Sequence, residues 1–250
     1  MPVRNLSIID WGIGGVSIYK LIKQVLGDVS VTYFSDTGVT PYGKMSRAEL
    51  VSRLNAAIRF LKKRGVTHLV IGCNAASTAL GDIDAAGLVI EGVIEPAVAM
   101  TARLRPARLG LIGGRRTVVS GVYRRTFAKL GVPVRQRVAQ PLSGLIESGD
   151  VGSDTLRYEA RRILAPIRDS SHILLACTHY PAVREVLAEF VSSETKFIDP
   201  AGELIKRIAR WRLEAGGNDE FLTSGDVRQM KAAAKKAFGV TIGKASKVRF

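Results

Sequence analysis

Two cysteines, Cys73 and Cys177, are the residues of this chain whose type and setting point to chemistry. Each follows a short apolar run, His68-Leu-Val-Ile-Gly in one case and His172-Ile-Leu-Leu-Ala in the other, and the chain has no further cysteine. A thiol has an ordinary pKa of about 8.5, so it can both take and give a proton near neutral pH. Two thiols that face each other across a cleft can remove the α-proton of an amino acid from one face and supply a proton to the other. That reaction is racemisation, a form of general acid–base catalysis.

Two further side chains are candidates to tune the thiols. His179 follows Cys177 by two residues, and an imidazolium at that position would favour a thiolate. Asp10 ends the first apolar run of the chain, and a carboxylate there can help to take the proton of Cys73. Position alone leaves open whether Asp10 has this function or caps a helix.

Other roles for these residues fit the sequence less well. A single buried cysteine is commonly a small core residue, but both cysteines here are followed by polar side chains. A redox pair is disfavoured because there is no Cys-x-x-Cys motif and 104 residues (177 − 73) separate the thiols. The three histidines lack metal-ligand spacing, so we expect no metal. No motif marks a Schiff-base lysine, so no pyridoxal phosphate or other cofactor is implied.

The apolar runs indicate how the thiols are positioned. Ile173–Ala176 has no polar break, which is typical of a strand buried on both faces of a parallel sheet. His68 and His172 then stand at the amino-terminal ends of their strands, and the cysteines follow the carboxyl ends, where ligands bind in open α/β sheets. Strands and helices alternate throughout the chain. We therefore predict an α/β protein with two similar lobes, largely parallel sheets flanked by helices, and an active site in the cleft between the lobes.

The boundary between the lobes is expected near Glu95-Pro96, which interrupts the alternation. The first lobe is predicted to contain residues 1–95 plus about 210–250, and the second residues 96–209. Ser46 is a good N-cap for a helix that ends near Arg64, and one helix is expected from Thr117 to about residue 130. The basic segment Val240–Phe250 is expected to be loosely held.

Two turn-rich stretches are candidate binding loops. Gly12-Ile13-Gly14-Gly15 follows the first strand but lacks the full dinucleotide fingerprint, so we expect its backbone N–H groups to approach a small anion at the following helix. The second stretch, from Asp36 to Gly43, is a long loop beside a strand end, where binding loops often lie.

Composition narrows the class of protein. The 250 residues are 46% hydrophobic, and no apolar run is long enough for a signal peptide or a membrane span. We therefore expect a cytoplasmic protein that does not bind membranes. The net charge of +15 invites a nucleic-acid interpretation. The basic residues are spread over helical segments, however, so solvated faces that attract small anions are favoured over a nucleic-acid site.

Motifs along nearly the whole chain resemble the cofactor-independent glutamate racemases of the aspartate/glutamate racemase superfamily. The most specific motif is Cys177-Thr-His-Tyr-Pro181. The others, in chain order, are Asp10-Trp-Gly-Ile-Gly-Gly15, Tyr33-Phe-Ser-Asp-Thr37, Pro41-Tyr-Gly43, Cys73-Asn74, Gly92-Val-Ile-Glu-Pro96, Thr117-Val-Val-Ser120, Leu145-Ile-Glu147 and Leu222-Thr-Ser-Gly-Asp226.

The resemblance implies a role for each matching residue. It implies two pseudo-symmetric lobes, Cys73 and Cys177 as opposed acid/base residues, and Asp10, Glu147 and His179 as their supports. It also implies substrate binding by the following residues: Pro41, Tyr42, Gly43, Asn74 and Thr178, and by the positions of Trp11 and Ala75.

Three departures concern the residues that hold the substrate. Trp11 and Ala75 stand where the family usually has Ser and Thr, and Gly38-Val39-Thr40 contains no basic residue where the family usually carries one. These changes predict a reshaped pocket. Trp11 could compensate by closing the cleft, by donating its N–H, or by packing against a different side chain.

Three functions therefore remain open from the sequence. The first is a glutamate racemase that supplies D-glutamate for peptidoglycan synthesis. The second is a relative that racemises aspartate or another amino acid, and the third is a non-catalytic binding protein. Retention of both cysteines argues against the third, and the sequence leaves a homodimer open.

Overall fold

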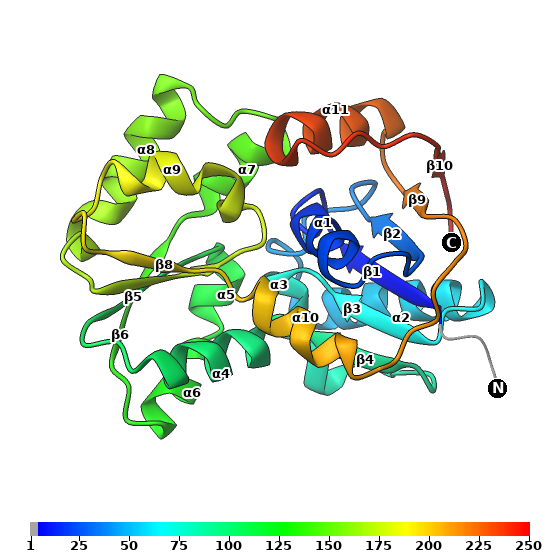
Figure 1. The fold of residues 1–250 in the computed structure, drawn as a ribbon, viewed down its shortest axis with the longest axis horizontal. Coiled ribbons are helices and arrows are strands. Elements are labelled where there is room, and N and C mark those ends of the chain that lie inside the picture. The colour runs from blue at the N-terminus through cyan, green and yellow to red at the C-terminus, as the bar shows by residue number, and fades with distance from the viewer. Residues whose placement is uncertain (1–4) are drawn as a thin grey trace.

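The computed structural model describes residues 5–250 as two lobes, each built on a parallel sheet flanked by helices (Figure 1). This confirms the predicted fold class. All strand pairs within the two sheets are parallel. Because parallel strands end at the same edge of a sheet, residues that follow neighbouring strands lie close together.

The larger sheet has six strands in the order β10-β9-β2-β1-β3-β4. In chain order these strands are β1 (Leu6–Asp10), β2 (Val31–Ser35), β3 (His68–Ile71), β4 (Val89–Gly92), β9 (Glu220–Thr223) and β10 (Ala245–Lys247). The smaller sheet has the order β6-β5-β7-β8. Its strands are β5 (Leu109–Gly113), β6 (Val134–Val138), β7 (His172–Ala176) and β8 (Lys196–Ile198).

Helices connect the strands and cover both faces of each sheet (Figure 1). The α-helices are α1 (Val16–Val25), α2 (Arg47–Lys63), α3 (Asn74–Ser77), α4 (Ile94–Leu104), α5 (Arg115–Val119), α6 (Val122–Lys129), α7 (Gln140–Glu147), α8 (Asp154–Leu164), α9 (Arg184–Ala188), α10 (Ala201–Ala209) and α11 (Val227–Phe238). Three short 3-10 helices are η1 (Leu80–Asp82), η2 (Ala165–Ile167) and η3 (Tyr180–Val183). None of the helices in residues 5–250 is long and apolar enough to cross a bilayer.

Each sheet has a hydrophobic core on both faces, because neighbouring side chains of a strand point in opposite directions. In β1, Ile8 packs into the core that α1, α10 and α11 cover, and Ile9 packs into the core that α2 covers. In β7, Leu174 and Leu175 belong to opposite cores in the same way. The unbroken apolar run of β7 is therefore explained by burial on both faces.

Helix α2 begins at the predicted N-cap. Glu49 N–H donates to Ser46 Oγ (3.2 Å), and Ser46 N–H donates to Glu49 Oε2 (2.7 Å). This reciprocal pair satisfies two of the backbone donors that a helix start leaves unpaired.

Two helix predictions are wrong in the middle of the chain. Glu95 and Pro96 do not interrupt the alternation but lie in the first turn of α4, where the missing N–H of a proline costs no hydrogen bond. The helix expected from Thr117 is split into α5 and α6 at Gly121, whose φ of 67° is left-handed. Glycine adopts this conformation without the steric penalty of a Cβ atom.

The C-terminal segment is held more firmly than the sequence predicts. Strand β10 pairs with β9, and Ile242 is buried. The terminal Phe250 ring stacks on Phe60 with centroids 4.8 Å apart and meets Phe34 edge-on at 5.4 Å. The guanidinium of Arg53 lies 4.0 Å from the centroid of the Phe250 ring. These contacts fasten the end of the chain to the first sheet and to α2.

The proposed limits of the lobes, residues 1–95 plus about 210–250 and residues 96–209, stay a prediction. Strands β9 and β10 extend the larger sheet through the pairing of β9 with β2. Helix α10 lies just before the predicted return point, and its side chains Leu204, Ile205 and Ile208 pack into the core of the larger sheet.

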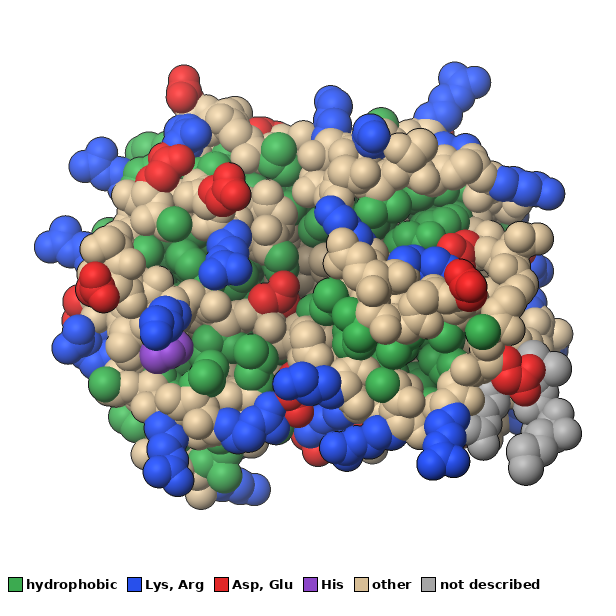
Figure 2. All heavy atoms as spheres, viewed as in Figure 1, with side chains coloured by type: hydrophobic (Ala, Val, Ile, Leu, Met, Phe, Trp, Pro, Cys, Tyr) green, Lys and Arg blue, Asp and Glu red, His purple; other side chains and the backbone are tan. Residues whose placement is uncertain are grey.

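Positive side chains are scattered over both lobes on the face shown in Figure 2 and are not gathered into a single patch there. The interpretation of the net charge of +15 as solvated helix faces stays a prediction.

We expect Phe250→Ala to lower the free energy of unfolding by about 1–2 kcal/mol, because it removes two ring contacts and a cation–π contact. Urea unfolding followed by circular dichroism measures the change. Tyr158→Ala is the matched control, since Tyr158 is 65% exposed on α8 and its loss should cost less than about 0.5 kcal/mol. Equal losses for the two variants would show that the Phe250 contacts do not anchor the C-terminal segment.

Candidate active site

A cavity of about 420 Å³ is lined by residues from both lobes. Cys73 follows β3 in the first lobe and Cys177 follows β7 in the second, and both are free thiols. Eleven of the twelve residues selected from the sequence line this cavity: Asp10, Trp11, Pro41, Tyr42, Gly43, Cys73, Asn74, Ala75, Cys177, Thr178 and His179. The twelfth, Glu147, lies behind His179 and contacts it. The structure therefore brings together residues that are up to 169 positions apart (179 − 10).

Asp10 is held at the carboxyl end of β1 by two backbone donors. Its carboxylate accepts from Trp11 N–H (2.7 Å) and from Gly15 N–H (2.8 Å). Burial raises the pKa of Asp10, while the charge of His179 and the Gly15 hydrogen bond act in the opposite direction. Asp10 therefore anchors the turn before α1 and also borders the cavity, while its function beside Cys73 stays a prediction.

Cys73 lies next to this carboxylate. Burial raises the pKa of the Cys73 thiol well above its ordinary value, and the negative charge of Asp10 raises it further. A hydrogen bond from the Ala76 backbone acts in the opposite direction but is outweighed. Cys73 is therefore a protonated thiol near neutral pH, with a carboxylate beside it that can accept a proton.

Cys177 lies beside an imidazole instead of a carboxylate. Its sulfur lies 3.6 Å from His179 Nδ1, and His179 Nε2 lies 2.7 Å from Glu147 Oε2. Burial lowers the pKa of His179, but the hydrogen bonds and negative charges of Cys177 and Glu147 outweigh burial and raise the pKa well above its ordinary value. His179 is thus an imidazolium that donates one N–H toward the sulfur and the other to Glu147.

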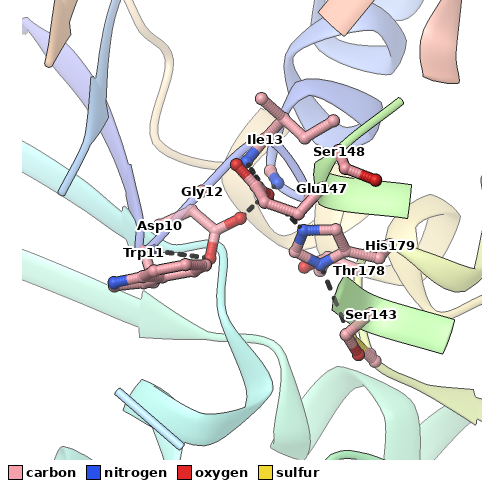
Figure 3. A network of polar contacts seen from close by, with 12 residues as sticks. Asp10, Trp11, Gly12, Ile13, Ser143, Glu147, Ser148, Thr178 and His179 are labelled. Carbon is pink, nitrogen blue, oxygen red and sulfur yellow. Dashed lines mark hydrogen bonds and ion pairs between the residues drawn. The ribbon is translucent and has the colours of Figure 1, made fainter. Parts of the chain in front are cut away.

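The turn after β1 connects the group of Cys177, His179 and Glu147 to the first lobe. Ile13 N–H donates to Glu147 Oε2 (2.9 Å), so that Glu147 lies between the turn and His179 (Figure 3). A Cβ atom at Gly12 would collide with the Glu147 carboxylate, and one at Gly14 would collide with Thr178 and His179. Glycine is needed at both positions because the two lobes touch there.

The prediction that the N–H groups of this turn approach a small anion is wrong about which anion they bind. The backbone N–H groups bind carboxylates of the protein itself, Asp10 through Gly15 and Glu147 through Ile13. The sequence pattern located the donors correctly, but Glu147 is 134 residues away from Ile13, so only the folded chain identifies the acceptor.

Asn74 offers a free donor to the cavity. Its Oδ1 accepts from the Tyr123 hydroxyl (2.8 Å), which fixes the orientation of the amide. Its Nδ2 is buried and finds no acceptor within residues 5–250. A buried donor without a partner costs free energy, so this N–H group suits a carboxylate of a bound ligand.

Trp11 uses its polar group within the protein. The indole N–H donates to the Val39 carbonyl oxygen (3.1 Å), and the ring lines the cavity. Of the three ways in which Trp11 was expected to compensate for the lost hydroxyl, donation of its N–H to the substrate is therefore wrong. The side chain instead supports the loop that leads to Pro41 and Tyr42.

The loop from residue 36 to residue 43 is anchored on a buried carboxylate. Asp36 accepts two hydrogen bonds from the Arg53 guanidinium (2.8 and 2.6 Å) and one from the Tyr42 hydroxyl (2.8 Å). Ser224 Oγ, from the segment after β9, donates a fourth (2.7 Å). A buried charge needs such pairing, and here the pairing places Tyr42 and Gly43 at the cavity.

Seven further residues of the described chain line the cavity: Lys44, Gly114, Thr117, Gln140, Pro141, Ser143 and Gly144. Thr117 begins one of the motifs that carry the resemblance, whereas no sequence pattern singled out Lys44, Gln140 or Ser143. Ser143 Oγ lies 3.5 Å from the Cys177 sulfur. Gln140 and Ser143 belong to α7, which begins after β6, so the rule that ligands bind at strand ends could have found them. Lys44 directly follows the predicted binding loop. Among residues 5–250, no group of three or more His, Cys, Asp or Glu side chains could hold a metal ion.

The chain is similar to known proteins over most of its length. A glutamate racemase of Geobacter metallireducens is 32% identical over 217 residues, which cover 84% of this chain and 80% of that protein. A glutamate racemase of Desulforudis audaxviator is 31% identical over 213 residues, which cover 82% of this chain and 78% of that protein.

A solved structure shares the fold over the whole chain. The crystal structure of glutamate racemase from Francisella tularensis subsp. tularensis in complex with D-glutamate superposes with a TM-score of 0.90, at 24% identity, and covers 100% of this chain and 98% of that one. The model of the Asp/Glu/Hydantoin racemase family matches residues 6–208. Because this match includes most of the chain, the protein belongs to the Asp/Glu/Hydantoin racemase family.

Proposed function

We propose that this protein is a cofactor-independent amino-acid racemase, an isomerase that interconverts L- and D-glutamate. The observation that carries the proposal is that each lobe contributes one free thiol, Cys73 or Cys177, to the lining of a single cavity. The glutamate racemases to which the chain is similar support glutamate as the substrate.

The two thiols have the neighbours that proton transfer in both directions needs. In one direction the thiolate of one cysteine takes the α-proton, and the thiol of the other cysteine gives a proton to the opposite face of the carbanion. Each turnover therefore exchanges the protonation states of Cys73 and Cys177. Asp10 can accept and return a proton beside Cys73, and His179 can do so beside Cys177.

The substrate is held by groups from both lobes. Asn74 Nδ2 is the free donor in the first lobe, and Thr178 lines the cavity from the second. The turn of Pro41, Tyr42 and Gly43 closes another part of the lining. A carboxylate of glutamate fits the unpaired amide of Asn74, since it is an acceptor with no donor of its own.

The biological role and setting follow from this activity. D-glutamate is consumed in peptidoglycan synthesis, so we assign the enzyme to the supply of that precursor. Catalysis by two free thiols suits the cytoplasm, where thiols stay reduced.

A homodimer remains a prediction, and light scattering in solution tests it.

Replacing either cysteine should abolish racemisation. We expect Cys73→Ala and Cys177→Ala each to lose about 10²- to 10⁴-fold in rate, the usual contribution of a general acid or base. The fold should survive, because the change removes only a sulfur atom. In ²H₂O each variant should still exchange the α-proton of one enantiomer, and the two variants should act on opposite enantiomers. Polarimetry and proton NMR follow the two reactions, and full racemase activity in either variant would refute the mechanism.

The charges beside the thiols predict a bias in turnover. Asp10→Asn should lower kcat most in the direction in which Cys73 removes the proton, and His179→Asn should show the opposite bias. KM must change in parallel, because the enantiomers have equal free energy and kcat/KM is the same in both directions.

The pH profile gives a second measurement of the role of His179. Its pKa is raised, so the imidazolium persists above pH 6.5 and loses its proton only as the pH rises further. The wild type should therefore lose activity on the alkaline side through a group that His179→Asn removes. Equal losses of kcat in both directions for Asp10→Asn and for His179→Asn would exclude the assignment of Asp10 to Cys73 and of His179 to Cys177.

The departures at Trp11 and Ala75 are tested by restoring the usual hydroxyls. We expect wild type to turn over glutamate at least as well as the double variant Trp11→Ser/Ala75→Thr, because the Trp11 indole supports the loop through Val39. Initial rates on glutamate and aspartate decide the question. A gain on glutamate of about 10-fold or more, the worth of one hydrogen bond to a charged group, would instead favour the alternative of a relative that acts on aspartate or another amino acid.

A further inference from the structure

We propose that Lys44 determines specificity for the side-chain carboxylate of the substrate, and that Arg116 from the opposite lobe positions it. Neither residue belongs to the motifs that carry the family resemblance. The inference rests on the proposed racemase function, because it concerns the substrate of that same cavity.

The cavity lining has little positive charge. Lys44 is the one lysine or arginine among the described residues that line it. The other cation, His179, is already engaged by Glu147 and Cys177. Asp10 adds a buried acidic group, so a substrate with two carboxylates meets unfavourable charge unless a further cation is near. Lys44 is exposed and lines the cavity, so it is the residue that can supply that charge.

The sequence of the binding loop supports the same conclusion. Gly38-Val39-Thr40 lacks the basic residue that the resemblance leads one to expect before Pro41. Lys44 follows Pro41 by three residues on the same loop, and both line the cavity. In this chain the one basic residue between Asp36 and Lys44 therefore follows the Pro41-Tyr42-Gly43 turn.

The backbone that carries Lys44 is fixed from two directions. Lys44 N–H donates to the Pro41 carbonyl oxygen (2.7 Å), which closes the turn. Within the first lobe, the Tyr42 hydroxyl is held by Asp36 (2.8 Å). From the second lobe, Arg116 Nε–H donates to the Tyr42 carbonyl oxygen (3.0 Å), and its Nη2 donates to the Met45 carbonyl oxygen.

Arg116 therefore holds the two carbonyl groups on either side of Gly43 and Lys44. The guanidinium presents its donors in a planar fork, so one side chain can bind both groups, whereas a lysine ammonium lacks this geometry. Arg116 is on α5 in the second lobe, whereas Tyr42 and Met45 belong to the first. The position of Lys44 is consequently tied to the closed arrangement of the lobes around the cavity.

A direct pairing makes a specific kinetic prediction. Lys44→Met should raise KM for glutamate about 10- to 100-fold, the worth of a hydrogen bond between charged groups. The value of kcat should change by less than about threefold, because the side-chain carboxylate is bound equally in the ground state and the transition state. The preference for glutamate over glutamine should fall by a similar factor, and Lys44→Arg should restore most of it.

Arg116 is tested as a positioning residue. Arg116→Met should also raise KM for glutamate, and Arg116→Lys should bring KM only part of the way back. The double variant Arg116→Met/Lys44→Met should have a KM no higher than that of Lys44→Met alone. Such non-additivity is expected when one residue acts through another. Arg124→Met is the charge-matched control, since Arg124 is exposed on α6, and its KM should equal that of wild type.

Several outcomes would overturn the inference. One is an unchanged KM for glutamate in Lys44→Met. Another is an equal rise of KM in Arg124→Met, which would indicate general electrostatic attraction only. The third is full additivity of the effects of Lys44→Met and Arg116→Met on KM. If Arg116→Met does not fold, as judged by circular dichroism, the comparison of Lys44→Met with Lys44→Arg decides the matter. Failure of wild type to racemise glutamate would refute the proposed function, whereas normal turnover with an unchanged KM in Lys44→Met would refute only this inference.

Discussion

The site depends on one carboxylate, that of Glu147. It accepts a hydrogen bond from the Ile13 backbone in the first lobe and one from His179 in the second. Because Glu147 is on α7 in the second lobe, the bond from Ile13 joins the lobes, and the bond from His179 orients the imidazole toward Cys177. The lobes approach this closely only because Gly12 and Gly14 have no Cβ atoms, since any side chain there would occupy the space of Glu147, Thr178 or His179. This contact between the lobes and the environment of Cys177 thus depend on the same carboxylate.

A second buried carboxylate has the corresponding role for the substrate loop. Asp36 is buried and would be costly without partners, and it receives donors from Arg53, Tyr42 and Ser224. Ser224 comes from the C-terminal part of the chain, and the terminal Phe250 covers the Arg53 guanidinium. The end of the chain therefore helps to hold a loop that begins some 190 residues earlier (224 − 36 = 188). This explains why the tail is ordered although its composition suggested otherwise.

Local signals were sufficient to predict much of the fold and the core of the site. The apolar runs located β3 and β7, and the strand-end rule then placed Cys73 and Cys177 in one cavity. Contacts between residues far apart in the sequence could not be predicted. The partner of Ile13, the role of Arg116 and the stacking of Phe250 each join residues far apart in sequence, and no spacing rule describes them. Helix α4 was missed for a different reason, because a proline in the first turn resembles a proline that ends an element.

The two thiols are similar in their place on the sheets but opposite in their electrostatic surroundings. Cys73 borders an acidic group, whose negative charge disfavours the thiolate, whereas Cys177 borders an imidazolium. The charge of Asp10 therefore favours the protonated form of Cys73 in the resting enzyme. Since the enantiomers have equal free energy, this asymmetry cannot favour one product at equilibrium. It can only affect the order of events. One enantiomer binds to the enzyme in its resting protonation state, and the other binds after the thiols have exchanged protons with their neighbours.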